Sequence, residues 1–456
     1  MSYHLAVDIG ASSGRCILGR LVDGLFCINE FHRFPNQLVE RGGHLCWDID
    51  RIFSEILAGL VKCRGLDAPL SSVGIDTWAV DFVLLDENCA LLGDTVSYRD
   101  KRTEGCDEDV YAIIPEAELY RRTGIQKQLF NTIFQLRAIQ RDSPVLLERA
   151  AHFLMLPDYL HYKLCGVMSN EYTNATSTGL VNAQKRSWDL EIIEKLGFPA
   201  RIFKPLIKPA VKLGGFTAEV REAAGFNCDV IIPVTHDTPS AVMAVPSSDA
   251  VYISSGTWSL IGIECDSPNC GEDARKNNFT NEGGFDKFCF RKNIMGLWLF
   301  QEVIRESGGD LSFESCEYAD IESIIDVNSN RFFSPHSMTA EIKNACAETG
   351  QKAPKTPAET VKVIFKSLAH CYAKSTSEIE TLTGKTFNVI HIVGGGTKID
   401  YLNRLVKEAS GKKVRVNPVE ASAIGNISAQ MIAYGEFKDL KEARECISKS
   451  FAVKEY

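Results

Sequence analysis

Residues 4–20 read HLAVDIGASSGRCILGR and give the first indication of the fold class. Residues 4–9 predict an apolar β-strand, residues 10–14 favour a tight turn of small residues, and residues 15–20 predict a returning strand. The turn is not a Walker A motif, because no Gly-Lys-Ser/Thr follows it. A dinucleotide fingerprint is excluded as well, since it needs a helix after the glycines. A turn between two strands can still hold a small anion with its backbone N–H groups.

The same pattern occurs a second time far along the chain. Residues 250–254 predict a strand, residues 255–257 form a Ser-Gly-Thr turn, and residues 258–264 predict the returning strand. Two such units, one opening each half, favour a duplicated fold. We place the boundary after residue 243, which gives an N-terminal domain over 1–243 and a C-terminal domain over 244–456.

Strands and helices alternate through both halves, which is typical of an α/β protein. One helix is expected to start with Thr238 as N-cap and Pro239 at the first helical position, and another with the capping box Thr356-Pro357-Ala358-Glu359. Further strands are predicted at residues 72–76, 80–85, 229–235, 388–393 and 412–416.

Three carboxylates lie at the C-terminal ends of predicted strands. Asp8 precedes the first turn, Asp76 ends a strand, and Asp237 lies between a strand and a helix start. Open α/β sheets bind ligands at this edge. A single Asp in a loop is usually a cap or turn residue, but three at strand ends, with two small-residue turns, favour a cleft for Mg²⁺ and phosphate.

The bulk composition narrows the classes of function. A formal net charge of −9 argues against non-specific binding to nucleic acid or anionic membranes. The N-terminus has no signal-peptide pattern, and no uncharged apolar run approaches the ~20 residues that span a bilayer. The 15 cysteines are scattered without a CxxC pair, so we expect reduced thiols, no structural metal and a cytoplasmic protein.

Twelve short blocks, in a fixed order along nearly the whole chain, carry a family resemblance. They are VDIGASSGR (7–15), GIDTW (74–78), VDFVLLD (80–86), YRD (98–100), MLPDY (155–159), EYTNAT (171–176), HDT (236–238), SSGTWSL (254–260), NEGG (281–284), NIMGLW (293–298), IVGGG (392–396) and PVEA (418–421). Together they resemble the FGGY carbohydrate kinases, and within that family the members that act on L-rhamnulose.

The resemblance implies a duplicated, actin-like ATPase (ribonuclease H-like) fold of two domains around a central ligand cleft. It implies a mainly sugar-binding N-terminal domain, which also supplies a phosphate-contacting hairpin, and a mainly ATP-binding C-terminal domain. The implied reaction transfers the γ-phosphoryl group of MgATP to O1 of L-rhamnulose, a step of rhamnose catabolism. The substrates are then a small sugar and ATP, without nucleic acid or membrane, and the oligomeric state stays open.

The resemblance also carries residue roles onto matching positions. Asp237 matches the catalytic base, and a helix start beside it would favour the ionised carboxylate. Asp8, and with it Asp76, is expected to hold Mg²⁺ through water. The expected ATP-binding residues are Ala11, Ser12, Ser13, Gly14, Arg15, Thr257, Gln301 and Gly395. The expected substrate-binding residues are Ala79, His236, Asp237, Thr238 and Asn293.

Some positions depart from the family pattern. Ala79 stands where the family usually has Gly, which would cost most if its φ were positive, and Ile399 stands where an Asn is expected. Trp78 and Phe82 either pack a deoxy methyl group or are core aromatics. The alternatives are a kinase for another ketose such as L-fuculose or xylulose, a non-catalytic sugar sensor, and an actin-like chaperone ATPase, for which the chain has no additional substrate-binding domain.

Overall fold

The computed structural model describes residues 2–247, 249–309, 311 and 313–456. The chain divides into two compact units, each built from separated segments. The first comprises the residues up to Pro246 together with Glu264–Phe290 and Ser422–Ser450, and the second comprises Ser247–Ile263, Arg291–Ala421 and Phe451–Tyr456. The single domain boundary after residue 243 stays a prediction, because the compact units do not follow one cut in the sequence.

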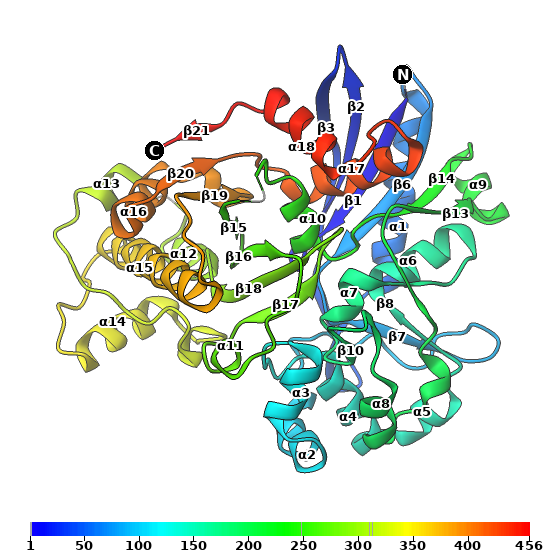
Figure 1. Cartoon of the computed structure of the whole chain (residues 1–456), viewed down its shortest axis with the longest axis horizontal. Helices are drawn as coiled ribbons and strands as arrows, with labels where there is room; N and C mark the ends of the chain where they lie inside the picture. Colours follow the sequence, from blue (N-terminus) through cyan, green and yellow to red (C-terminus); the bar gives the residue numbers. More distant parts are fainter. Residues whose placement is uncertain (1, 248, 310, 312) are drawn as a thin grey trace. The chain divides into compact units, whose positions relative to one another are not determined.

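The first unit contains a six-stranded mixed sheet with the order β13-β14-β6-β1-β2-β3. Strand β1 pairs antiparallel with β2 and parallel with β6, and β6 pairs parallel with β14. Figure 1 shows β1, β2, β3 and β6 side by side. The bounds are β1 Tyr3–Ile9, β2 Ser13–Val22, β3 Leu25–Pro35, β6 Leu70–Thr77, β13 Val211–Gly215 and β14 Asp229–Ile232.

The sheet of the second unit repeats this plan. Six of its seven strands follow the order β18-β16-β15-β19-β20-β21, with β15 antiparallel to β16 and parallel to β19, and β20 antiparallel to the edge strand β21. The two predicted hairpins therefore open equivalent sheets, and the duplication is confirmed. The bounds are β15 Val251–Ser255, β16 Trp258–Cys265, β18 Phe288–Met295, β19 Val389–Val393, β20 Lys413–Val416 and β21 Lys454–Glu455.

The two larger apolar clusters of the first unit lie on and beside its sheet. One joins the sheet to α1 (Ile49–Lys62), whose buried stripe of Ile49, Ile52, Ile56 and Leu60 has the spacing of one helix face. The other lies around α4 (Thr132–Asp142) and β8 (His152–Met155). Strand β7 (Phe82–Leu85) supplies alternate side chains to the two cores, so it connects them.

The second unit is built around a long helix, α15 (Pro357–Thr383), which packs beside α16 (Asp400–Ser410) (Figure 1). The predicted capping box at its start is confirmed, with Thr356 and Glu359 each bonding the other's backbone. Gly384 ends the helix with φ +66°, a left-handed conformation that glycine adopts without strain.

Two local predictions are wrong. The strand predicted from residue 80 begins at Phe82, because Val80 has a positive φ of 70° that cannot belong to a strand. The helix predicted to start after a Thr238 cap is α10 (Asp237–Met243), whose first bond runs from the Ser240 N–H to the His236 carbonyl. Pro239 lies inside the first turn, where its missing N–H has no helical partner to lose.

Two helices near the end of the sequence complete the first unit. Helix α17 (Ala421–Tyr434) bonds the sheet through Asn426 Nδ2 to the Gly74 carbonyl (3.2 Å) and Gln430 Nε2 to the Leu5 carbonyl (2.9 Å). From α18 (Leu440–Ser450), Arg444 donates to the carbonyls of Val242 and Met243 at the end of α10. Segments distant in sequence therefore fix the helix that carries Asp237.

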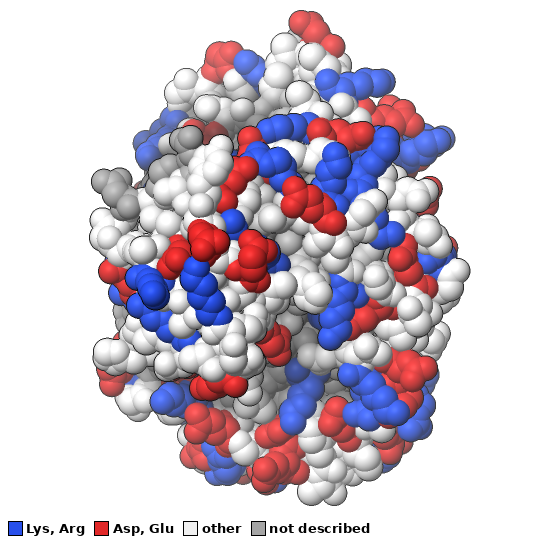
Figure 2. All heavy atoms as spheres, turned by 90° about the vertical axis from the view of Figure 1, so that its left-hand side faces the viewer, with Lys and Arg blue, Asp and Glu red and all other residues white. Residues whose placement is uncertain are grey.

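The charged side chains and the helices of the described residues bear on the classes of partner. On the face shown in Figure 2, acidic and basic side chains are interspersed rather than gathered in one patch of a single sign. Within the described residues, no helix combines the length and apolar character needed to cross a bilayer. All 15 cysteines are free.

Candidate active site

Three adjacent strands of the first unit bring the predicted carboxylates to one edge. The parallel register of β1 and β6 sets Asp8 opposite Asp76. The next residue, Thr77, forms a bridge with His236, which precedes Asp237. Asp8 and Asp76 thus lie at the C-terminal ends of neighbouring parallel strands and Asp237 lies beyond the end of the next one, as the sequence predicted, although their chemical roles stay predictions.

The Asp76 carboxyl is fully buried. Burial raises its pKa well above the usual range, the nearby Asp8 carboxylate adds to this, and a hydrogen bond from Asn426 Nδ2 (2.6 Å) acts in the opposite direction. Asp8 is also buried and accepts a bond from Arg15 Nη2 at 2.7 Å. Among the described residues, nothing pairs with Asp76 Oδ1. A buried carboxylate oxygen without a partner fits a site that a cation completes.

The candidate base lies in a fixed but accessible setting. The Asp237 side chain is 29% exposed, whereas His236 and Glu282 are 5% and 7% exposed. Thr238 Oγ1 donates to Asp237 Oδ1 at 3.1 Å, and His236 Nε2 lies 3.6 Å from the same oxygen. His236 Nδ1 lies 2.9 Å from Glu282 Oε2, so the imidazole stands between two carboxylates. Sequence reasoning had assigned no role to Glu282.

The first hairpin turn is held by Asn36, which directly follows β3, as well as by its own residues. The Gly10 N–H donates to the Ser13 carbonyl (3.0 Å), and Asn36 bonds the turn twice, with its N–H to the Ser12 carbonyl and its Nδ2 to the Gly10 carbonyl. Gly14 is needed for packing, because an added Cβ would lie 2.7 Å from a Phe34 ring carbon. Ser12 is exposed at the tip, as a phosphate-contacting turn requires.

Residues 78–81 form a closely packed loop after β6. Trp78 is 6% exposed, and its indole donates to Asp81 Oδ2 (2.8 Å). Phe82 stacks on Phe153 with ring centroids 4.9 Å apart. Both aromatic side chains therefore lie in the core, which was one of the two alternatives left open. The Ala79 φ is not positive, so the departure from Gly at this position brings no left-handed strain.

The predicted nucleotide residues of the second unit gather at one edge of its sheet. The Thr257 carbonyl accepts from the N–H groups of Gly296 and Trp298, which places the start of α12 (Trp298–Glu306) beside the Ser-Gly-Thr turn. Gln301 is exposed on the first turns of this helix. Asn293, which was predicted to bind the sugar rather than the nucleotide, lies on β18 and accepts a bond from Arg291 Nη1 at 2.7 Å.

The triple glycine reaches the same edge because β15 and β19 are parallel neighbours. A Cβ on Gly394 would lie 2.9 Å from the Ser255 carbonyl oxygen, and one on Gly396 would lie 2.6 Å from the Ser255 Cβ. Gly395 is exposed between them. The second turn and the glycine turn are thus in backbone contact, an arrangement that lets a ligand approach main-chain atoms closely.

Comparison with known proteins agrees with this architecture. A family model described as the FGGY family of carbohydrate kinases, N-terminal domain, matches residues 3–244, and its C-terminal counterpart matches residues 251–434. The chain belongs to the FGGY family of carbohydrate kinases. The kinase class predicted from the motifs is therefore confirmed, and with it ATP and a sugar as the substrates that this family takes.

Individual FGGY kinases are similar over the full length. The chain is 49% identical to a rhamnulokinase of Halalkalibacterium halodurans (100% of this chain, 99% of the relative) and 42% identical to one of Bacillus subtilis (99% and 94%). Among solved structures, a ligand-bound xylulose kinase from Lactobacillus acidophilus has a TM-score of 0.83 at 16% identity (100% and 94%). A Plasmodium falciparum glycerol kinase with ADP has a TM-score of 0.78 at 14% identity (99% and 94%). These structures support the two-domain α/β fold of the family.

One residue of this FGGY kinase that sequence reasoning missed is Glu171, fully buried before α7 (Tyr172–Thr176). Its carboxylate accepts bonds from Thr235 Oγ1 (2.8 Å) and the Thr235 N–H (3.2 Å), and from both donors of Thr173. Burial raises the Glu171 pKa, and these hydrogen bonds oppose the rise. Glu171 thereby holds the segment that leads directly into His236 and Asp237.

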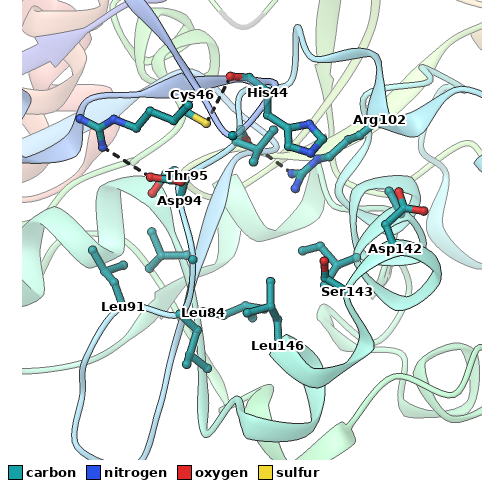
Figure 3. Close-up of a pocket in the computed structure, with 18 of the residues that line it drawn as sticks. His44, Cys46, Leu84, Leu91, Asp94, Thr95, Arg102, Asp142, Ser143 and Leu146 are labelled. Carbon is teal, nitrogen blue, oxygen red and sulfur yellow. Dashed lines mark hydrogen bonds and ion pairs between the residues drawn. The ribbon is translucent and has the colours of Figure 1, made fainter.

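A cavity of about 170 Å³ lies elsewhere in the first unit, beside β7 (Figure 3). Leu84, Leu91 and Leu146 form its apolar side, and His44, Arg102 and Asp142 lie around its polar side. Phe82, which stacks on Phe153 in the core, also lines it, whereas none of the residues predicted to contact the sugar hydroxyls, the nucleotide or the metal does. The predicted catalytic, ATP-binding and metal-binding residues therefore lie outside this cavity.

Proposed function

We propose that the chain transfers the γ-phosphoryl group of ATP to O1 of L-rhamnulose, with Asp237 as general base. The observation that carries this proposal is the 49% identity to a rhamnulokinase over the whole of both chains. Similarity of that extent, without a long gap, favours the same substrate over L-fuculose or xylulose.

The surroundings of Asp237 support its role as the base. A base must be reachable by the sugar hydroxyl and held in one orientation, and Asp237 is 29% exposed with Thr238 Oγ1 on one carboxylate oxygen. Asp237 would accept the proton as the hydroxyl attacks phosphorus, an effect that contributes on the order of 10²–10⁴-fold. In-line positioning and neutralisation of phosphoryl charge supply the larger part of the rate.

Mg²⁺ fits the carboxylate pair of Asp8 and Asp76. Mg²⁺ prefers oxygen ligands, keeps several waters and commonly uses one or two carboxylates, so a cluster of three protein ligands is not needed. Asp76 Oδ1, buried and without a partner among the described residues, is a suitable acceptor of such a hydrated ion. When bound, the ion would neutralise charge on the phosphates, while Arg15 keeps Asp8 in place.

The remaining residues divide between nucleotide and sugar. The backbone of residues 11–15 would contact phosphate with Thr257, and Gln301 and Gly395 would lie along the nucleotide. Ala79, His236, Thr238 and Asn293 would contact the sugar. A hydroxyl-rich ligand requires convergent donors and acceptors of this kind. The first unit would then bind mainly sugar and the second mainly ATP.

The test is ADP release from MgATP with L-rhamnulose, L-fuculose, D-xylulose and glycerol, for the wild-type chain, Asp237→Asn and the control Asp67→Asn. Asp67 is a surface carboxylate with a 69% exposed side chain, so its amide variant matches the charge change alone. We expect L-rhamnulose to be preferred, Asp237→Asn to lose at least about 10²-fold in kcat, and the control to be unchanged. Preference for another sugar would refute the substrate, and an active Asp237→Asn would refute the base.

A further inference from the structure

A strained turn lies at the proposed sugar-binding loop. The Asp81 N–H donates to the Ala79 carbonyl at 3.0 Å, across Val80, whose φ is +70°. This is a γ-turn with a positive φ at its centre, a rare conformation for any residue other than glycine and most unfavourable for a β-branched one. Such strain persists only where surrounding structure enforces it, and it concentrates at functional sites.

The surroundings hold the Val80 peptide groups on both sides. The Val80 N–H donates to Ser177 Oγ (3.2 Å), and the Val80 carbonyl accepts from Thr132 Oγ1 (2.6 Å) and Gln135 Nε2 (3.3 Å). Thr132 and Gln135 come from the first turn of α4, whereas Ser177 follows α7. All three side chains are buried, so water does not compete for these bonds.

The next residue is fixed just as firmly. Asp81 is 1% exposed, and its Oδ2 accepts from the indoles of Trp47 (2.6 Å) and Trp78 (2.8 Å), while its Oδ1 accepts from Gln135 Nε2 (3.0 Å). A buried carboxylate is costly unless several donors satisfy it, and here they come from three separate segments of the chain. The strained backbone at Val80 and the buried carboxylate of Asp81 are thus adjacent, and surrounding side chains stabilise both.

Ala79 is the residue that this arrangement leaves available. Within residues 78–81 it alone is not buried, and no described residue accepts a bond from its backbone N–H. The other polar groups of the turn, on Val80 and Asp81, are paired with protein. A rigid loop with one remaining main-chain donor is suited to orient a hydroxyl group of a ligand.

We propose that Thr132, Gln135, Ser177 and Asp81 are positioning residues for sugar binding, which hold the Val80 γ-turn so that Ala79 meets the sugar in one orientation. This inference rests on the proposed function, since it requires Ala79 to contact the sugar. The four residues act through the turn and touch neither substrate. Their loss should therefore weaken sugar binding and leave ATP binding unchanged.

The decisive variant is Thr132→Val, which keeps the side-chain shape and removes the hydroxyl that bonds the Val80 carbonyl. We expect the KM for L-rhamnulose to rise about tenfold, the worth of one buried hydrogen bond, with the KM for ATP within twofold. Thr132→Ser retains the hydroxyl and should stay near wild type. Ser177→Ala removes the bond on the other side of the turn and should raise the same KM.

Thr123→Val is the control, because Thr123 is similarly buried and its hydroxyl bonds no residue of the loop: it donates to the Leu119 carbonyl and accepts from the Ile125 N–H. It should lower the unfolding midpoint without changing either KM. If Thr132→Val lowers stability as Thr123→Val does but leaves the sugar KM unchanged, or raises both KM values alike, the inference is wrong. If the wild-type chain prefers another sugar, the proposed function fails separately, and the same comparison with that sugar decides the role of the turn.

Discussion

Replacing Gly425 on α17 by alanine should displace the candidate base Asp237 through α10, without changing any residue of the site itself. An alanine Cβ there would lie 2.6 Å from the carbonyl carbon of Ser240 on α10, and closer still to its oxygen. Ordinary contact begins at 3.4 Å, so the approach to the carbonyl oxygen requires α10 or α17 to move by more than about 1 Å. Ser240 is three residues beyond Asp237, and a displacement of that size in a catalytic group can cost about 10²-fold in rate.

The assay compares kcat and the unfolding midpoint of Gly425→Ala with those of Gly65→Ala, where an added Cβ meets nothing within 4 Å. Alanine favours a helix over glycine by about 1 kcal/mol, so propensity alone would stabilise the variant. We expect instead a loss of about 1–3 kcal/mol from overpacking and a marked fall in kcat. If Gly425→Ala is as stable and as active as the Gly65→Ala control, then the contact between α17 and α10 does not position Asp237.

Three further outcomes follow from buried groups. The pKa of His161 is lowered to about 3, chiefly by burial, and its neutral Nε2 accepts the Ile75 N–H. Below about pH 6.5 this histidine binds a proton in the unfolded chain but not in the native chain, so acid favours unfolding. The free energy of unfolding measured by denaturant titration should therefore fall by about 2 kcal/mol from pH 7 to pH 5, and by less in His161→Gln. Gly396→Ala should raise the KM for ATP but not for sugar, with partial recovery in the double variant with Ser255→Gly, since that change removes the clashing Cβ; equal changes in both KM values would contradict this. Glu171→Gln presents an amide nitrogen to backbone and hydroxyl donors, so it should lower stability by about 1–3 kcal/mol and reduce kcat, and unchanged kinetics would show that its segment does not position the base.

The parts of the fold that were predictable are those marked by glycine and small residues. The turns at residues 10–14 and 255–257 predict the two hairpins, and the capping box at Thr356 predicts the start of α15. The three carboxylates could be placed at strand ends because a buried parallel strand is a continuous apolar run. These signals depend on residues close together in the sequence, so one sequence is enough to recognise them.

What escaped prediction depends on contacts between distant segments. Val80 carries no local sign of a left-handed turn, and it adopts one because Thr132 and Ser177 bond its peptide groups. Glu282 reaches His236 from 46 residues along the chain. Asn36 bonds the first hairpin turn from the position just after the third strand. The sequence shows none of these pairings, since each partner is an ordinary polar residue until the fold brings the two together.

The first unit is built from segments that are far apart in the sequence, and this affects the order in which the chain can fold during synthesis. Its sheet is complete by Ile232, but Leu5 and Gly74 receive their bonds from α17, and α10 receives Arg444 from α18. A ribosome therefore makes nearly the whole second unit before the first can close. Until α17 has been synthesised, the side of the sheet that this helix covers stays exposed. We therefore expect this enzyme to depend on chaperones more than a protein whose domains are each encoded by one continuous segment.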